Sequence, residues 1–423
     1  MRVLIEAQIE PGIYGGIEQF LIGLLKGLGQ FKDSNEEYII ISHWKYPDLL
    51  RPYLAANQRI IPAPRPKQEK LEWMKIILGP LRKPLGVCFR RMQYFINGAS
   101  KQHIYSVPTS NGFYEGLSGD VLHITYPPNY LTSQLPTIFT IYDLQHRHFP
   151  QFFPGGDINM REVLYAKAFD ESKIVTAVSE WVREDVIQQY GVDPEKIFYV
   201  PSAAPTESYE KLSSPDLLRT KHKFSLPEHF MLYPALTYEH KNHIGLLDAI
   251  VLLRDTHNTK INLICTGQQH LHWPKIKEHL KELKLGNQVR FLGFIRPGEV
   301  RALYHLADFL IFPSLFEGVG LPLLEAFKEG TPVACSDIPA FREYGKDAAF
   351  FFNPNSIEDM AKAILRMFSD NELRTNLQKK GQERISHYSW EKTAKAYHAL
   401  YRKMAGKNLT EEDQAFICTQ KIS

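Results

Sequence analysis

Residues 312–344 read FPSLFEGVGLPLLEAFKEGTPVACSDIPAFREY, and this segment carries the strongest structural signal in the chain. A short apolar run, typical of a strand, leads into a loop with Gly318 and Gly320, where the backbone can approach a ligand closely. Pro322 suits the first turn of a helix, because its missing N–H costs nothing there. The free amides of Gly318, Val319, Gly320 and Leu321 and the positive helix end therefore predict a site for an anion or a hydroxyl group.

Two carboxylates flank this turn. Glu317 precedes the glycines, and Glu325 follows eight residues later. We expect Glu325 in the first helical turn, facing the same cleft as Glu317. A carboxylate can accept two hydrogen bonds from vicinal hydroxyls, as on a ribose or a pyranose. The alternative, two glutamates on the exposed part of an amphipathic helix, fits the surrounding glycines and proline less well.

Strands and helices alternate outward from this segment in two series, which predicts parallel sheets with right-handed crossovers. The expected fold is α/β, with two doubly wound Rossmann-like domains facing across a cleft. The expected strands are residues 2–7, 37–42, 136–142, 173–178, 196–200, 230–236, 261–266, 289–293, 308–312 and 332–335. The expected helices are residues 16–29, 243–254, 322–329, 356–368, 371–386 and 390–404, with a further helix after Ser179 as its cap.

A stretch rich in Ser, Pro and Lys separates the two series and marks a domain boundary. The predicted divisions are an N-terminal domain at 1–205, a linker at 206–228 and a C-terminal domain at 229–387. A helix at 388–404 is expected to return to the first domain, and a polar tail at 405–423 to fray.

The spacing of Glu317 and Glu325 resembles the E-x7-E signature of the retaining family-four glycosyltransferases with the GT-B fold. The two glycines, the proline and the later Gly330-Thr331-Pro332-Val333 also match that signature. The resemblance covers essentially residues 1–404. It implies that Glu317 lies at the donor sugar and that Glu325 binds the ribose of the nucleotide.

The implied activity is that of a hexosyltransferase. It would move a sugar from a GDP- or UDP-sugar to a hydroxyl of a glycan or lipid-linked glycan, retain the anomeric configuration, and need no cofactor besides the donor. Other enzymes of the same fold, such as a nucleotide-sugar epimerase or a phosphorylase, remain alternatives, as does a non-catalytic sugar-nucleotide binding protein.

A diphosphate requires positive charge and backbone donors. Lys241, within His240-Lys241-Asn242, is similar to the family's H-K-N element, whose Lys contacts the diphosphate; the alternative is a solvated surface lysine. The family's usual Arg several residues earlier is missing here. In the first half, the amides of Gly15 and Gly16 resemble the family's glycine loop, although an ordinary turn is the alternative.

Three further elements are expected at the cleft. Gly267 ends a strand, and Phe294 is a candidate for holding the nucleotide base, with a core phenylalanine as the alternative. Asp143 resembles the Asp of the family's H-D-L element, although Tyr142 replaces its His. The catalytic candidates are therefore Asp143, Lys241 and Glu317. The alternative role for Asp143 is to cap a turn. His146 is expected on the acceptor side, and Asp143 is expected to orient His146 or Arg147 or to contact an acceptor hydroxyl.

The overall charge excludes some classes of function. The 423 residues contain 50 Lys and Arg against 47 Asp and Glu, a net charge of +3, which does not indicate a nucleic-acid binder.

The chain has no D-x-D motif, and its histidine pairs lack matched ligands, so no metal site is expected. Four scattered cysteines and the lack of an apolar run of about 18 residues favour a cytoplasmic protein.

One segment departs from this balance. Residues 65–101 contain nine bases and two acids, a net charge of +7, with many apolar residues between them. Two interpretations remain open: an excursion packed on its own domain, and an interfacial surface that makes peripheral contact with the inner membrane face.

The interfacial interpretation predicts that the protein floats with vesicles containing anionic lipid at low salt. Each base near such a surface contributes about 1 kcal/mol. Replacing Arg82, Lys83, Arg90 and Arg91 by Ser is expected to abolish flotation. If the unaltered protein fails to float, or if the variant floats equally well, the segment is an ordinary packed excursion.

Overall fold

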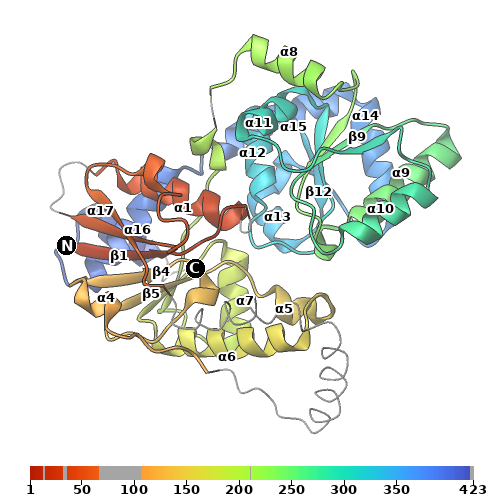
Figure 1. The fold of residues 1–423 in the computed structure, drawn as a ribbon. Helices are drawn as coiled ribbons and strands as arrows, with labels where there is room; N and C mark the ends of the chain where they lie inside the picture. Colours follow the sequence, from red (N-terminus) through yellow and green to blue (C-terminus); the bar gives the residue numbers. More distant parts are fainter. Residues whose placement is uncertain (13–14, 32–35, 66–105, 210, 420–423) are drawn as a thin grey trace, which may run out of the picture.

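The computed structural model describes residues 1–12, 15–31, 36–65, 106–209 and 211–419. Two α/β domains face each other: one runs from red to yellow and includes the last blue helices of the chain, and the other runs from green to blue (Figure 1). Most of the basic segment, residues 66–101, lies outside the described residues. Within the described ranges, no helix combines the length and the apolar character needed to cross a bilayer.

The first domain is built on a seven-stranded parallel sheet in the order β3-β2-β1-β4-β5-β6-β7. Its strands are β1 (Arg2–Ala7), β2 (Glu37–Ser42), β3 (Gln58–Pro62), β4 (Val121–Ile124), β5 (Thr137–Ile141), β6 (Ile174–Ala177) and β7 (Ile197–Tyr199). Its helices are α1 (Gly15–Leu28), α4 (Phe113–Gly116), α5 (Gln145–His148), α6 (Gly155–Glu171) and α7 (Glu180–Tyr190). Short 3-10 turns are η1 (Arg51–Tyr53), η4 (Pro127–Asn129), η5 (Pro150–Phe152) and η6 (Pro205–Ser208).

The second domain repeats the plan with six strands in the order β10-β9-β8-β11-β12-β13. Its strands are β8 (Met231–Pro234), β9 (Leu263–Thr266), β10 (Val289–Phe291), β11 (Phe309–Phe312), β12 (Val333–Ser336) and β13 (Phe350–Phe352). Its helices are α8 (Ser214–Lys223), α9 (His243–His257), α10 (Trp273–Glu282), α11 (Pro297–Leu306), α12 (Leu321–Glu329), α13 (Pro339–Gly345), α14 (Ile357–Ser369) and α15 (Asn371–Ile385), with the turns η7 (Glu239–Lys241) and η8 (Lys346–Ala348).

Both strand orders are those of doubly wound sheets, which confirms the predicted GT-B architecture. In such sheets ligands bind beyond the carboxyl ends of the strands, where the strand order reverses. These points lie between β1 and β4 in the first domain and between β8 and β11 in the second. The strands read as nearly continuous apolar runs because helices cover both faces of each sheet.

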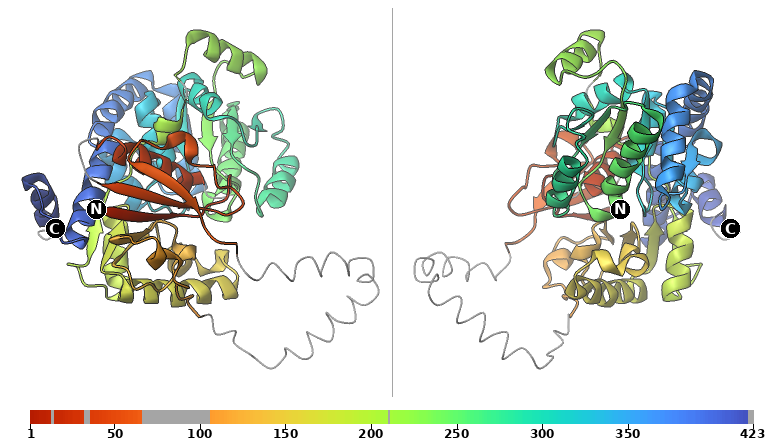
Figure 2. Two further views of the ribbon diagram at one scale, coloured as in Figure 1. Left: turned by 60° about the vertical axis from the view of Figure 1, so that its left-hand side comes forward. Right: turned by 90° about the vertical axis from the view of Figure 1, so that its right-hand side faces the viewer.

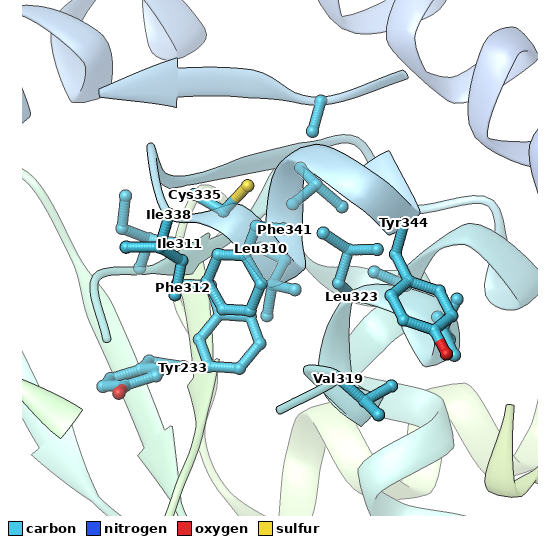
Figure 3. Packing of buried hydrophobic residues seen from close by; sticks show 14 of the residues in the cluster. Tyr233, Leu310, Ile311, Phe312, Val319, Leu323, Cys335, Ile338, Phe341 and Tyr344 are labelled. Carbon is cyan, nitrogen blue, oxygen red and sulfur yellow. The ribbon is translucent and has the colours of Figure 1, made fainter. Parts of the chain in front are cut away.

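Core packing fixes the glycine loop of the second domain. The rings of Phe312 and Phe341 lie 4.5 Å apart between β11 and α13, among the buried side chains of Figure 3. A Cβ on Gly320 would collide with Phe341, and Gly320 also has a φ of +88°. Only glycine therefore allows the chain to turn from β11 into α12 over this pair of rings.

Helix α16 (Trp390–Met404) returns to the first domain, as predicted, and packs against α1 (Figure 1). The indole of Trp390 donates to the carbonyl of Ala204 at 2.9 Å. Beneath the helix, the imidazole of His123 lies 2.7 Å from both the Tyr401 hydroxyl and the Thr140 hydroxyl. Burial lowers the pKa of His123 to about 3, so a neutral imidazole ties α16 to β4 and β5.

Helices occupy two segments expected outside the domains, and the expected fraying of the tail was wrong. Helix α8 lies inside the expected linker and packs on α11, with an ion pair of 2.6 Å between Lys223 and Glu299. Helix α17 (Glu411–Thr419) lies inside the expected frayed tail, on the outer side of α16 (Figure 2). Thr410 caps α17: its hydroxyl accepts from the Asp413 amide at 3.1 Å, while the Asp413 carboxylate accepts from the Thr410 amide at 2.8 Å.

A contact between α13 and α7 joins the two domains. The carboxylate of Glu343 accepts hydrogen bonds from the amides of Glu180 and Trp181, both at 2.9 Å, at the start of α7. The hydroxyl of Tyr344 donates to the carbonyl of Val178 at 2.5 Å. The second domain thus supplies the acceptor for a helix end of the first.

The packing of α1 on α16 predicts that Gly23→Ala destabilises the protein. A Cβ at Gly23 would collide with the indole of Trp390, and overpacking of this kind costs about 1–3 kcal/mol. In the matched control, Gly156→Ala in α6, the new Cβ meets nothing within 4 Å, and alanine is favoured by up to about 1 kcal/mol. Urea unfolding checks both variants; equal midpoints would contradict the packing described.

Candidate active site

The candidate site lies where glycine loops of the two domains meet. A Cβ on Gly318, after β11, would overlap the carbonyl oxygen of Tyr142, after β5, and would lie 3.5 Å from Cβ of Asp143. A Cβ on Gly16 would lie 3.7 Å from Cδ1 of Leu321. The predicted loops of both halves are therefore brought together at the carboxyl ends of the two sheets.

Lys241 and Glu317 form an ion pair at this meeting point. The Lys241 Nζ lies 2.5 Å from Oε1 of Glu317, and the two side chains are 16% and 14% exposed. Asn242 holds the lysine loop in place, since its amide donates to the carbonyls of Pro313 at 3.2 Å and Pro354 at 3.0 Å. The structure thus unites two predicted catalytic candidates that lie 76 residues apart.

Lys241 supplies the positive charge of its element. Burial lowers the pKa of the neighbouring His240 well below its usual value, so that imidazole is neutral. The Lys241 carbonyl accepts from the hydroxyl of Tyr233 at 2.6 Å, which fixes the backbone of this turn. Helix α12 begins at Leu321, so its first free amides lie at the same loop. A cation and a helix amino end are together suited to a diphosphate.

Glu325 lies in the second turn of α12, not in the first as expected, because the helix begins four residues earlier. The side chain is buried, with the residue 6% exposed. Its Oε2 accepts from the hydroxyl of Tyr304 at 2.6 Å, and its Oε1 accepts from the hydroxyl of Tyr209. Burial raises the pKa of Glu325 to about 7, although both tyrosine hydroxyls act in the opposite direction. Sequence reasoning assigned neither tyrosine to the site.

Phe294 and Gly267 lie at the ends of neighbouring strands. The Phe294 side chain follows β10 and is 74% exposed, so the alternative of a core phenylalanine is wrong. Gly267 follows β9 with a φ of +121°, and a Cβ there would collide with the carbonyl of Ala235. The Gly267 amide donates to the carbonyl of Gly293 at 2.9 Å. The loops after β8, β9 and β10 are thus held together beside an exposed ring.

Asp143 caps a turn in the structure. Its Oδ1 accepts from the amide of Gln145 at 2.9 Å, at the start of α5. The expectation that Asp143 orients His146 is not met, because the His146 Nε2 contacts other residues and its buried Nδ1 has no hydrogen-bond partner. The His146 Nε2 lies 3.3 Å from the Tyr190 hydroxyl and 3.2 Å from the Glu162 carboxylate. His146 is therefore placed to join α5, α6 and α7 and not to contact an acceptor, which corrects its expected role.

A contact that sequence reasoning missed involves the next histidine. The ring of His148 stacks on Phe316 with 5.1 Å between centroids, and Phe316 directly precedes Glu317. The His148 Nε2 lies 2.8 Å from the buried carboxylate of Asp185. The first domain thus touches the loop that carries Glu317.

In the described part of the chain, no three His, Cys, Asp or Glu side chains converge as a metal site would require.

Two family models match the chain in succession. "Glycosyltransferase Family 4" matches residues 14–208, and "Glycosyl transferases group 1" matches residues 216–384. O-antigen chain mannosyltransferase B of Escherichia coli is 27% identical over 289 residues, which are 66% of this chain and 74% of that protein. The serotype-specific mannosyltransferase WbdA of Escherichia coli is 26% identical over 269 residues, 62% of this chain but only 33% of WbdA.

Solved structures show the same fold. Alr3699/HepE of Anabaena, in complex with UDP and glucose, superposes with a TM-score of 0.67 at 15% identity, covering 95% of this chain and 100% of that one. WaaG, a glycosyltransferase involved in lipopolysaccharide biosynthesis, gives 0.65 at 13% identity, covering 96% and 100%. Because the two family models adjoin and together span both domains, the chain belongs to the family-four glycosyltransferases.

Proposed function

We propose that this glycosyltransferase moves a hexosyl group from a GDP- or UDP-sugar to a hydroxyl of a glycan or lipid-linked glycan, with retention at the anomeric carbon. The observation that carries the proposal is the Lys241–Glu317 pair beside the amino end of α12 and opposite the glycine loop of the first domain. The similar mannosyltransferases of O-antigen chains make a mannosyl donor the first candidate.

Lys241 has the main part in the proposed chemistry. The leaving diphosphate gains charge as the glycosidic bond breaks, so a cation and fixed amides stabilise the transition state more than the bound donor. Transfer of the Lys241 ammonium from Glu317 to the diphosphate leaves the carboxylate free to accept a hydroxyl of the donor sugar. With the charge supplied by the side chain and by the amides of Gly16 and the α12 loop, the proposed reaction needs no metal.

Retention follows in this proposal from attack on the face that the diphosphate leaves. The diphosphate itself takes the proton of the acceptor, and no protein nucleophile is used. The pairing of Glu317 with Lys241, and of Glu325 with two tyrosines, supports hydroxyl recognition over the paired-carboxylate chemistry of glycosidases. We expect the close approach of the domains at Gly318 to help exclude water from the site once the donor is bound.

Acceptor dependence tests the reaction type. The protein is incubated with GDP-mannose or UDP-glucose, with and without a membrane extract that contains lipid-linked glycans, and released nucleoside diphosphate is measured. Release only with acceptor supports transfer. Acceptor-independent conversion of the donor would indicate an epimerase, and nucleotide binding without turnover would indicate a binding protein. The proposed place of the reaction is the cytoplasmic face of a membrane, where the basic and apolar residues of 65–101 would make peripheral contact.

Lys241→Ala is expected to lower kcat by roughly 100- to 1000-fold relative to the unaltered protein, the usual cost of losing one donor to a developing charge. Glu325→Ala is expected to lower kcat less. Lys277→Ala, on the exposed surface of α10, is the matched control and is expected to leave kcat unchanged. Steady-state kinetics distinguish the outcomes. A raised KM with a normal kcat would show that Lys241 contributes only uniform binding.

Glu325→Ala is expected to weaken binding of the free nucleoside diphosphate, because it removes the acceptor for two ribose hydroxyls. Hydrogen bonds to a charged group contribute about 1.5–3 kcal/mol, which corresponds to roughly 10- to 150-fold in Kd. Isothermal calorimetry measures the change, with Glu383→Ala on the exposed face of α15 as control. Unchanged affinity would remove Glu325 from the ribose site.

A further inference from the structure

Two tyrosines of different origin bind the carboxylate of Glu325. Tyr304 comes from α11 of the same domain, and its side chain is fully buried. Its carbonyl accepts from the hydroxyl of Thr331 at 2.9 Å, so its backbone is also fixed. Tyr209 comes from the connection between the domains, directly after η6, and remains partly exposed. One hydroxyl that binds the Glu325 carboxylate therefore comes from the buried helix α11, and the other comes from the connection between the domains.

Each oxygen of the carboxylate already accepts a hydrogen bond from one tyrosine hydroxyl. Tyr304 donates to Oε2 and Tyr209 donates to Oε1, while the residue is almost wholly buried. A vicinal diol engages both oxygens of one carboxylate, so a ribose would meet the Tyr209 hydroxyl at Oε1. Since Tyr304 lies in the core, Tyr209 is the donor that can yield its place.

We propose that Tyr209 is an internal competitor of the ribose: its hydroxyl occupies Oε1 of Glu325 in the free protein and is displaced by the ribose hydroxyls of a nucleoside diphosphate. This inference rests on the proposed function, which gives Glu325 the ribose. Both states leave the buried carboxylate hydrogen-bonded, which avoids the cost of an unsatisfied buried acceptor. One hydroxyl donor replaces another at the carboxylate, and no covalent bond is formed or broken.

Displacement of Tyr209 changes how the domains are joined. The preceding turn η6 (Pro205–Ser208) contacts both α1 of the first domain and α12 of the second. The hydrogen bond from Tyr209 to Glu325 fixes the connection to α12 at that place. Nucleotide binding removes this hydrogen bond between the connection and α12, while the contact of η6 with α12 remains. By linkage, any change that weakens this hydrogen bond strengthens nucleotide binding by the same factor.

Tyr209→Phe tests the proposal, with Tyr304→Phe as the matched control on the same carboxylate. Calorimetry measures the Kd of each variant for GDP, for UDP, and for the 2′,3′-dideoxy forms of both. Tyr209→Phe is expected to bind GDP or UDP about tenfold more tightly than the unaltered protein, the fold-change equivalent to ~1.4 kcal/mol. The gain is expected to vanish with the dideoxy nucleotides, and Tyr304→Phe is expected to show none.

Unchanged or weaker binding by Tyr209→Phe, while the unaltered protein binds GDP or UDP, would overturn the competitor role and leave the proposed function standing. Failure of the unaltered protein to bind either nucleotide would instead overturn the proposed function and the inference with it. A second measurement keeps the test independent of the variant's folding. A 3-fluorotyrosine at position 209 is expected to change its fluorine chemical shift with the ribonucleotide and not with the dideoxy form; a shift unchanged by both would also overturn the proposal.

Discussion

The close approach of two backbones is the constraint on which the site depends. Gly318 of the second domain lies against the carbonyl of Tyr142 of the first, with no room for a side chain between them. The loop can lie there because Gly320 turns the chain over the Phe312–Phe341 pair without a Cβ. The glycines thus determine how near the two sheets come, and that separation places every other group. Glu317 directly precedes this contact, and its partner Lys241 and the amino end of α12 lie at the same loop.

Three carboxylates near the domain boundary, the buried Glu325 and the partly buried Glu317 and Glu343, accept hydrogen bonds from donors elsewhere in the chain. Glu317 has an ammonium, Glu325 has two tyrosine hydroxyls, and Glu343 has two amides of a helix end. An uncompensated buried charge would cost several kcal/mol, so the pairing of Glu325 is needed for the fold as well as for the site. A substrate that binds here exchanges partners with groups that are already satisfied. Selectivity then depends on how well its hydroxyls and phosphates replace the internal donors.

Much of this arrangement could be predicted from the sequence, because local signals and tertiary structure agree. The strands at 2–7 and 37–42 have the predicted bounds, and the glycines and Pro322 predicted the turn at α12. Tyr209 could not be found in this way, since its position depends on the path of the connection between domains. His146 was misplaced because a residue that follows a strand was assumed to face the cleft, whereas its ring turns toward Tyr190 and Glu162. Helix α17 did have a readable signal in its capping pair, Thr410 and Asp413.

The return of α16 to the first domain has a consequence for the order of synthesis. The core of that domain includes Phe20 on α1 and Trp390 and Tyr397 on α16, with ring centroids of Phe20 5.9 and 6.0 Å from the other two. A ribosome makes Phe20 first and Trp390 some 370 residues later, after the whole second domain. The domain that emerges first is thus the last to be completed, and its α1 face stays without its partner while the second domain folds. Chaperones that act during translation would meet this apolar face, and a chain truncated before α16 would expose it permanently.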